Sequence, residues 1–234
     1  MLEKLYEGKA KIIYQDEDPR AYRVYFKDDA TAFNGEKKAQ IAGKGELNAA
    51  ITAALFTYLG EMGIRHHFIR IIDGRTLLCE KLAMIPAEVV VRNVAAGSLA
   101  KRLGLEEGIA MKEPVVELFY KNDALGDPMI NRYHLQALGL ATFPEVEEME
   151  QIGLLVNEHL RAFFDERNID LIDFKLEFGR KDGEIVLGDE VTPDTCRLWD
   201  KRTREKLDKD RFRRDLGGVT EAYQEMYHRV VQEQ

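Results

Sequence analysis

The pattern of hydrophobic and polar positions predicts two hairpins near the N-terminus. Residues 5–14 and 21–26 are alternating or apolar runs separated by the turn-like sequence DEDPR, which is typical of paired strands. Residues 67–72 and 76–82 form a second such pair around Asp73-Gly74, a dipeptide that favours a tight two-residue turn. We therefore expect the chain to begin with a strand-rich region.

One stretch of this region has helical spacing instead. Between residues 46 and 59 the apolar side chains fall on one helical stripe, formed by Leu47, Ile51, Ala54, Leu55 and Tyr58. We expect Gly60 and Gly63 to end this helix, because glycine weakens helices and is common just after them. The first part of the chain is thus predicted to hold strands and one helix.

The rest of the chain mixes strands and helices without regular alternation. The expected elements are a strand at 88–94, a short helix from Ser98, a strand at 115–120, a helix at about 146–165, a strand pair within 171–190 and a terminal helix from Val219. This order favours an α+β fold over a doubly wound parallel sheet. We expect a domain boundary near residues 82–86, which divides the chain into 1–84 and 85–234.

The composition is that of a globular protein without a nucleic-acid partner. Of the 234 residues, 45% are hydrophobic and 32% are charged, which is enough apolar material for a packed core. The net charge of −8 argues against nucleic-acid binding, which needs a basic surface. Basic residues still gather at Lys9 and Lys11, at 197–204 and at 211–214. This pattern suits a small phosphorylated ligand, although each cluster alone also fits a solvated surface.

The cysteines and the N-terminus indicate a cytoplasmic protein. Cys79 and Cys196 are far apart and lack the CxxC spacing of zinc or redox sites, so we expect no disulfide and a reducing compartment. The N-terminal residues carry charges every few positions, and no apolar run is long enough to cross a bilayer. We therefore expect neither export nor a membrane partner.

The sequence LIDFKLEFG, residues 171–179, is the most informative segment. In a strand, Asp173, Lys175 and Glu177 share one face, while the large apolar residues between them face the core. These apolar residues are Ile172, Phe174, Leu176 and Phe178. Cross-strand ion pairing is the alternative explanation. An acid, a base and an acid on one face of an otherwise apolar strand favour a catalytic site.

A magnesium site is predicted where the chain returns after this strand. The sequence turns through RKDGE and brings Asp189 back towards Glu177. Two carboxylates are a common protein contribution to Mg²⁺, whose other ligands are water and phosphate. With an odd number of loop residues the two carboxylates share a face, whereas a two-residue Asp182-Gly183 turn places them on opposite faces. The hypothesis therefore includes a prediction about register.

The sequence IPAEVVVRNVAAGS, residues 85–98, predicts a phosphate site. Glu88, Val90 and Arg92 share one face of a strand, and small residues before Ser98 let the backbone approach a ligand closely. Helix N-terminal amides, a hydroxyl and a guanidinium together bind phosphate well. The alternative is that Ser98 only caps the following helix.

Other motifs are weak or missing. Lys9 and Lys11 fall on one face of a strand after Gly8 and are candidates to contact a triphosphate, although exposed lysines are also common on edge strands. Neither GxxxxGK[ST], GxGxxG nor GxSxG occurs. The five histidines lack the spacing of zinc ligands. P-loop, Rossmann, serine-hydrolase and zinc interpretations therefore have no support.

Taken together, these segments resemble the phosphoribosylaminoimidazole-succinocarboxamide synthase (SAICAR synthetase) family. The two long segments above carry the resemblance, and five others match in order: LYEGKAKIIY, KLAMIP, KNDALGDPMI, LGDEVTPDTCRLWD and DKDRFRRDLGG. The likeness covers essentially the whole chain. It implies a strand-rich N-terminal lobe over a larger mixed lobe, with ATP in the cleft between them.

The resemblance also implies an activity and a set of site residues. The family joins carboxyaminoimidazole ribonucleotide (CAIR) to L-aspartate, consumes ATP with Mg²⁺, and commonly forms homodimers. The implied catalytic groups are Asp173, Lys175 and Glu177, and the implied magnesium ligands are Glu177 and Asp189. The implied nucleotide-binding residues are Lys9, Lys11, Met84 and Lys121. The implied substrate-binding residues are Glu88, Arg92, Ser98, Asp127, Arg197, Asp210, Arg211 and Arg214.

Two other functions compete with the ligase. A small-molecule kinase would need a catalytic base for a hydroxyl acceptor, and the sequence has no HRD-like loop or DFG motif. A non-catalytic nucleotide-binding module would not need Asp173, Lys175 and Glu177 together. The release of ADP separates the three, because only the ligase needs both an imidazole ribonucleotide and aspartate for it.

Overall fold

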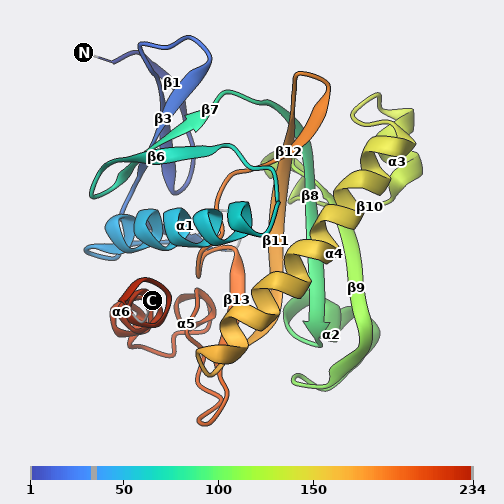
Figure 1. Ribbon diagram of the computed structural model, residues 1–234. Coiled ribbons are helices and arrows are strands. Elements are labelled where there is room, and N and C mark those ends of the chain that lie inside the picture. Colours follow the sequence, from blue (N-terminus) through green and yellow to red (C-terminus); the bar gives the residue numbers. More distant parts are fainter. Residues whose placement is uncertain (1, 33–35, 233–234) are drawn as a thin grey trace.

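The structure is a computed structural model that describes residues 2–32 and 36–232 (Figure 1). Its first sheet is antiparallel, with strand order β1-β2-β3-β7-β6. The strands are β1 (Lys4–Glu7), β2 (Lys11–Gln15), β3 (Ala21–Phe26), β6 (Phe68–Asp73) and β7 (Thr76–Glu80). The predicted second hairpin is confirmed as β6-β7. The prediction of one strand over residues 5–14 is wrong, because the chain reverses after Gly8 and Lys9 lies in the turn between β1 and β2.

The second sheet is larger and provides most of the buried residues. Its order is β10-β9-β8-β11-β12, and β13 also pairs with β11. The strands are β8 (Ala83–Val94), β9 (Ala110–Tyr120), β10 (Met129–Ile130), β11 (Ile169–Lys181), β12 (Glu184–Gly188) and β13 (Cys196–Asp200). A separate two-stranded sheet pairs β4 (Asp29–Ala32) with β5 (Lys37–Gln40).

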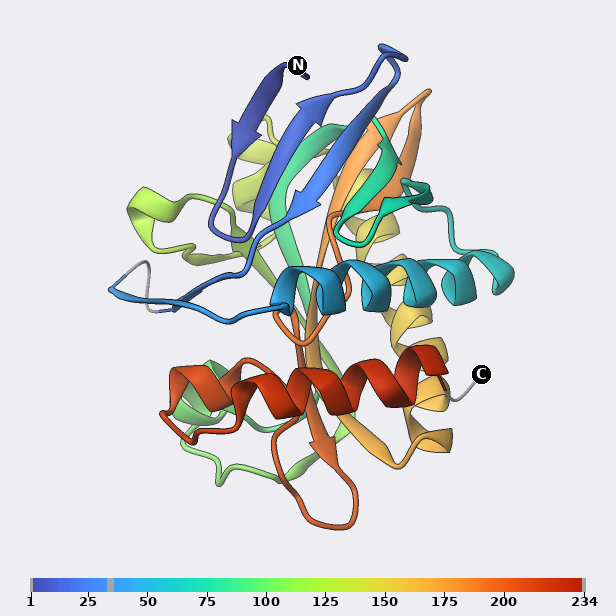
Figure 2. The same cartoon turned by 90° about the vertical axis from the view of Figure 1, so that its left-hand side faces the viewer.

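Helix α4 (Phe143–Glu166) packs on the second sheet, and α1 (Lys44–Glu61) packs against strands of the first sheet. The other helices are α2 (Gly97–Leu103), α3 (Arg132–Ala137), α5 (Asp210–Arg213) and α6 (Val219–Tyr227). Short turns of other helix types are η2 (Asp123–Leu125) and η3 (His228–Gln232). Helix α4 crosses β8 and β11, while α1 and α6 lie side by side (Figures 1 and 2). None of the helices in the described ranges combines the length and apolar composition that crossing a bilayer takes.

Helix α1 confirms the helical stripe and is longer than predicted. It runs to Glu61, so Gly60 lies inside its last turn and only Gly63, with φ 85°, follows the helix. Its residues Ile51, Leu55 and Leu59 belong to the main core, which otherwise comes largely from the second sheet, α4 and α6. The change from the first sheet to the second occurs at residues 81–82, but α1 packs into the core of the larger sheet. The division into 1–84 and 85–234 therefore stays a prediction.

Candidate active site

A cavity of about 690 Å³ lies between the two sheets. This volume is in the range of ordinary ligand pockets, which measure roughly 300–1,000 Å³. Most of the predicted site residues line it: Lys9, Lys11, Met84, Glu88, Arg92, Ser98, Lys121, Asp127, Asp173, Lys175, Glu177, Asp189 and Arg197. The fold therefore brings together side chains that are up to 188 positions apart in the sequence, from Lys9 to Arg197.

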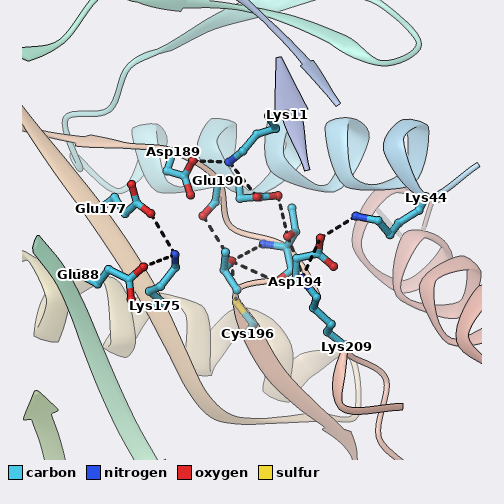
Figure 3. A network of polar contacts seen from close by, with 12 residues as sticks. Lys11, Lys44, Glu88, Lys175, Glu177, Asp189, Glu190, Asp194, Cys196 and Lys209 are labelled. Carbon is cyan, nitrogen blue, oxygen red and sulfur yellow. Dashed lines mark hydrogen bonds and ion pairs between the residues drawn. The ribbon is translucent and has the colours of Figure 1, made fainter. Parts of the chain in front are cut away.

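The predicted polar face of β11 opens into this cavity. Lys175 Nζ donates to Glu88 Oε1 at 2.7 Å and to Glu177 Oε1 at 3.0 Å (Figure 3). Lys121 pairs with the other oxygen of Glu177. Burial disfavours the charged form of Lys175, but the neighbouring carboxylates outweigh this effect and raise its pKa. Lys175 is therefore a protonated ammonium among these carboxylates.

A β-bulge adjusts the start of β11. Leu171 pairs with Leu198 and Asp173 with the adjacent Arg197, so Ile172 is an extra residue between two paired positions. Ile172 is fully buried, as predicted, but for this reason it does not share the face of Phe174. Ile172 packs instead in a small cluster with Ala96 and Trp199. The bulge sets Asp173 between Arg92 on β8 and Arg197 on β13.

Strands β11 and β12 pair in the register that a two-residue turn predicts. Lys181 pairs with Glu184, which leaves Asp182-Gly183 as the turn and sets Glu177 opposite Gly188. The odd-loop expectation is thus wrong, and strict alternation would turn Asp189 away from Glu177. However, Asp189 follows the last residue of β12 and has φ 56°, a left-handed conformation that breaks the alternation. Both carboxylates therefore line the same cavity. Figure 3 shows the two side chains near each other.

Lys11 holds the two acidic residues that follow β12. Its Nζ pairs with Asp189 and lies 2.8 Å from Glu190 Oε1. Burial alone would raise the pKa of Asp189, but Lys11 and Lys175 hold it below its usual value. Asp189 is therefore ionised across the physiological pH range. We refer below to the lysine cluster, which consists of Lys11, Lys121 and Lys175 with Glu88, Glu177, Asp189 and Glu190.

The donor set of the lysine cluster suits a hard divalent cation. Glu177 and Asp189 offer carboxylate oxygens, which are the ligands that Mg²⁺ prefers, and it usually takes only one or two of them from protein. In the described ranges 2–32 and 36–232, no group of three or more acidic, histidine or cysteine residues is placed to hold a metal alone. The residues therefore fit magnesium bound jointly with phosphate, and do not fit a structural metal site.

Arg92 is fixed by three hydrogen bonds. Its Nε donates to Glu117 Oε2 at 2.6 Å, its Nη1 to Asp173 Oδ2 at 2.9 Å and its Nη2 to Ser98 Oγ at 3.1 Å. Asp173 also accepts from Arg197 Nη1 at 2.8 Å. We refer to these residues, together with Asp210, as the arginine cluster: Arg92, Arg197, Glu117, Asp173 and Asp210. Arg197 Nε donates to Asp210 Oδ2 at 2.9 Å, which completes an alternating chain of charges.

Ser98 does not cap its helix. Helix α2 has Ala96 at its N-cap, and the Ser98 hydroxyl accepts from Arg92 instead. The capping explanation of Ser98 is therefore wrong. Gly97 has φ 52°, and a Cβ at this position would lie 2.4 Å from Nη2 of Arg197. Only glycine lets Arg197 approach the start of α2 this closely.

Comparison with known proteins identifies the family. The family model of SAICAR synthetase matches residues 4–230. The chain belongs to the SAICAR synthetase family. A phosphoribosylaminoimidazole-succinocarboxamide synthase of Brevibacillus brevis is 60% identical over 229 residues, which cover 97% of this chain and 96% of that protein. A second phosphoribosylaminoimidazole-succinocarboxamide synthase, of Clostridium acetobutylicum, is 57% identical over 229 residues, which cover 98% of this chain and 97% of that protein.

Solved SAICAR synthetase structures share the fold. One that was solved in complex with ADP superposes with a TM-score of 0.94 at 53% identity and covers 98% of both chains. The enzyme of Ehrlichia chaffeensis superposes with a TM-score of 0.95 at 44% identity and covers 97% of this chain and 98% of that one. The resemblance and the α+β fold class are thus confirmed. As a member of this family, the chain is an ATP-dependent ligase of purine biosynthesis.

Three predicted substrate residues of this SAICAR synthetase family member lie outside the cavity lining. Asp210 is buried behind Arg197 and contacts it directly. Arg211 donates to the carbonyl oxygens of Gly217 and Lys206, and Arg214 pairs with Glu107. The basic run 211–214 does not reveal its helical phase, so its residue types alone could not identify which side chains face the cavity.

The cavity is also lined by supporting residues that the sequence analysis missed. His67 Nε2 lies 3.0 Å from the Asp189 carbonyl oxygen, and its Nδ1 lies 3.0 Å from the Tyr22 hydroxyl. Burial lowers the pKa of His67 to about 4, so the ring is neutral and carries one proton. Because a carbonyl oxygen only accepts, Nε2 holds this proton and Nδ1 accepts from Tyr22. The pair fixes the backbone at Asp189.

Glu117 and Asp194 were missed as well. Glu117 is 5% exposed and binds Arg92 from β9, and Asp194 is buried against Lys44 of α1, with 2.6 Å between Nζ and Oδ2. Glu117 lies inside β9 and Asp194 in a TPDT turn, so neither carries a local signal of its partner. Only the pairing of distant segments could identify them.

Proposed function

We propose that the chain forms the amide bond between the carboxylate of CAIR and the amine of L-aspartate, with conversion of ATP to ADP and phosphate. The observation that supports this most directly is the position of the lysine and arginine clusters on one face of β11. Lys175 of the first cluster and Asp173 of the second are two residues apart on the same strand. A triphosphate and a ribonucleotide bound to the two clusters would therefore be neighbours.

ATP is assigned to the end of the cavity formed by the first sheet. Lys9, Lys11 and Lys121 are placed to contact phosphates, and Met84, near the connection between the sheets, is placed to meet adenine. Glu177 and Asp189 would hold Mg²⁺ with the phosphates. Bound magnesium would neutralise charge on the phosphoryl oxygens. The solved relative in complex with ADP supports a nucleotide in this fold.

CAIR is assigned to the arginine cluster. Arg92, Ser98 and Arg197 offer two guanidinium groups and a hydroxyl for its phosphate. Glu88, Asp173 and Lys175 would contact the imidazole and its carboxylate, with Asp127 at the margin of the cavity. Asp210 acts through Arg197. Because Arg211 and Arg214 lie outside the cavity, the proposal gives them no contact with a substrate.

The carboxylate of CAIR is activated as an acyl phosphate. One carboxylate oxygen attacks the γ-phosphorus of ATP, and the bond from this phosphorus to the ADP oxygen breaks. The aspartate amine then attacks the carbonyl carbon, the bond from this carbon to the phosphate oxygen breaks, and the departing phosphate takes the proton that the amine loses. Lys11 and Lys175 stabilise the charge that builds up on the transferred group. Holding the reactants together can supply on the order of 7 to 11 kcal/mol of the barrier.

Labelled substrate tests this proposal. CAIR with ¹⁸O in its carboxylate should transfer one labelled oxygen to the released phosphate, which would be read by mass spectrometry. Unlabelled phosphate would reject the acyl phosphate. ADP release should require both CAIR and L-aspartate, and release without L-aspartate would favour a kinase. Chelation of divalent ions with EDTA should stop turnover, and added Mg²⁺ should restore it.

The remaining expectations concern location and assembly. Cys79 and Cys196 are buried free thiols, which agrees with a reducing cytoplasm. The family resemblance supports a homodimer. Sedimentation equilibrium at micromolar concentration should give twice the chain mass of 26.9 kDa. A mass of one chain would reject the dimer without affecting the chemistry.

A further inference from the structure

A buried contact links the first sheet to Asp189, one of the two carboxylates assigned to magnesium. Tyr22 belongs to β3, His67 lies just before β6, and Asp189 follows β12 of the second sheet. The Tyr22 hydroxyl lies 3.0 Å from Nδ1 of His67, and Nε2 of the same ring lies 3.0 Å from the Asp189 carbonyl oxygen. The His67 ring therefore bridges a strand of the first sheet and the segment that presents Asp189.

The His67 ring is buried and attached to β12. The residue is 2% exposed, and its ring packs edge-to-face on Phe56 of α1, with 5.5 Å between the ring centroids. The His67 backbone N–H donates to the Leu187 carbonyl oxygen at 2.9 Å, and the Leu187 N–H donates to the Arg65 carbonyl oxygen at 3.0 Å. Backbone and side-chain contacts together thus join residues 65–67 to the end of β12.

Asp189 has a backbone conformation that needs such support. Its φ of 56° lies in the left-handed region, which is unfavourable for a residue with a Cβ atom. A residue keeps this conformation only where the surrounding structure holds it. In an extended conformation Asp189 would continue the alternation of β12, and its carboxylate would point away from Glu177. A contact that holds the Asp189 carbonyl group therefore also directs its carboxylate.

The two hydrogen bonds of the His67 ring have a definite direction. Burial lowers the pKa of the ring, which is therefore neutral and carries one proton. A carbonyl oxygen can only accept, so this proton is on Nε2, and Nδ1 accepts from the Tyr22 hydroxyl. Tyr22 thereby selects the tautomer of His67 that can donate to Asp189.

We propose that His67 and Tyr22 are positioning residues for Asp189. They hold it in the left-handed conformation that turns its carboxylate towards Glu177, and so determine how tightly the cavity binds nucleotide-bound magnesium. Neither residue touches the metal or the reacting atoms. This inference rests on the proposed function, which assigns Mg²⁺ to Glu177 and Asp189, and adds the residues that orient one of the two ligands.

Two contrasting substitutions of His67 test the inference. Mn²⁺ is the probe, because it prefers the same oxygen ligands as Mg²⁺ and its free form is measured by electron paramagnetic resonance. His67→Leu has no donor and should raise the Kd of Mn²⁺ for the ADP-bound protein about 10- to 100-fold, the usual effect of removing a group that orients a metal ligand. His67→Gln retains an N–H donor and should stay within about threefold of wild type.

A milder variant tests the role of Tyr22. Tyr22→Phe removes only the hydroxyl, so His67 can then place its proton on either nitrogen. The Kd of Mn²⁺ should rise about 3- to 10-fold, which is the loss of roughly one hydrogen bond. If His67→Leu does not fold, as thermal unfolding would show, Tyr22→Phe decides alone.

Matched controls separate orientation of the metal ligand from general damage to the cavity. His66→Gln and Tyr14→Phe make similar changes at neighbouring positions that do not line the cavity, and both should keep the wild-type Kd of Mn²⁺. The Kd of ADP in EDTA, measured by calorimetry, should stay within about twofold of wild type in every variant, because Asp189 acts through the metal.

The outcomes distinguish this inference from the proposed function. If His67→Leu binds Mn²⁺ like wild type, or if His67→Gln loses as much affinity as His67→Leu, the hydrogen bond does not orient Asp189 and the inference is wrong, while the magnesium site stands. An equal loss of ADP affinity in EDTA would show that His67 supports the whole cavity, which also contradicts the inference. If the wild-type protein binds no more Mn²⁺ than its ADP does alone, the assignment of magnesium fails and the inference fails with it.

Discussion

The lysine and arginine clusters occupy the same cavity but are built differently. In the arginine cluster, Arg92 and Asp173 are each 4% exposed, and every nitrogen of Arg92 has a partner. In the lysine cluster, Lys175 is 29% and Lys121 45% exposed, and these side chains reach their carboxylates by single point contacts. One cluster is a buried guanidinium–carboxylate network, and the other is a set of more exposed ammonium groups.

This difference suits two kinds of ligand. Guanidinium groups present fixed, planar donors that match a phosphate which binds and leaves unchanged. Lysines are compact charges on flexible stems, so they can leave Glu177 or Asp189 and follow a phosphoryl group as it moves. The comparison therefore predicts that the arginine cluster determines substrate affinity and that the lysine cluster determines the rate of the chemical step.

The largest effect is expected in the lysine cluster. Lys175→Ala or Glu177→Ala should lower kcat by at least about 10³-fold while the protein stays folded, because the charge on the transferred group loses its stabilisation. ADP release with all three substrates measures the rate, and circular dichroism checks the fold. Lys112→Ala, on an exposed part of β9, is the control. Turnover near the wild-type rate in either variant would contradict the assignment of the site.

Arg197→Lys should mainly affect affinity. Lysine keeps the charge but loses the planar fork, so we expect the KM for CAIR to rise about 10- to 100-fold with a smaller change in kcat. Steady-state kinetics with CAIR varied at saturating ATP and L-aspartate measures this. Arg204→Lys, on the exposed turn after β13, should behave as wild type. A change in kcat without a change in KM would show that the arginine cluster does not determine substrate affinity as proposed.

Glu117→Gln should have a smaller effect of the same kind. Glu117 touches no substrate in the proposal and positions Arg92, which keeps its bonds to Asp173 and Ser98. We expect the KM for CAIR to rise roughly 3- to 10-fold with kcat close to wild type, the cost of weakening one charged hydrogen bond. Glu113→Gln, exposed on the same strand, is the matched control. If kcat falls and KM does not change, Glu117 is not a positioning residue.

The smallest effect on activity is expected at Asp208, which lies behind the arginine cluster. Its side chain is fully buried, and burial together with Asp210 raises its pKa to about 7. The folded state thus binds a proton that the unfolded state loses near pH 4, so stability should fall as pH rises from about 4 to 7, by about 4 kcal/mol at most. Asp208→Asn should flatten this dependence.

Thermal unfolding between pH 4.5 and 7.5 measures the effect of Asp208. The difference in melting temperature between Asp208→Asn and wild type should grow in favour of the variant as the pH rises. Parallel curves for the two proteins would show that Asp208 is ionised in the folded state across this range. The KM for CAIR should change little in the variant, since Asp208 is not part of the cavity lining.

Local sequence determined the elements and the common faces on which the site depends. The alternation in LIDFKLEFG placed Asp173, Lys175 and Glu177 on one face, and the same rule grouped Glu88 with Arg92, because side-chain direction in a strand follows from position alone. The apolar stripe between residues 46 and 59 also predicted helix α1 correctly. The family resemblance added residues such as Met84 and Lys121, whose own surroundings carry no such signal.

Tertiary structure decided what depends on a distant partner or on a single backbone angle. The left-handed Asp189, the bulge at Ile172 and the phase of α5 each change which way a side chain points, and none changes the hydrophobic pattern. Partners such as Lys44 and Asp194 are 150 positions apart, and their contact exists only once the chain packs. The sequence therefore indicated part of the candidate site, and folding decided which side chains meet there.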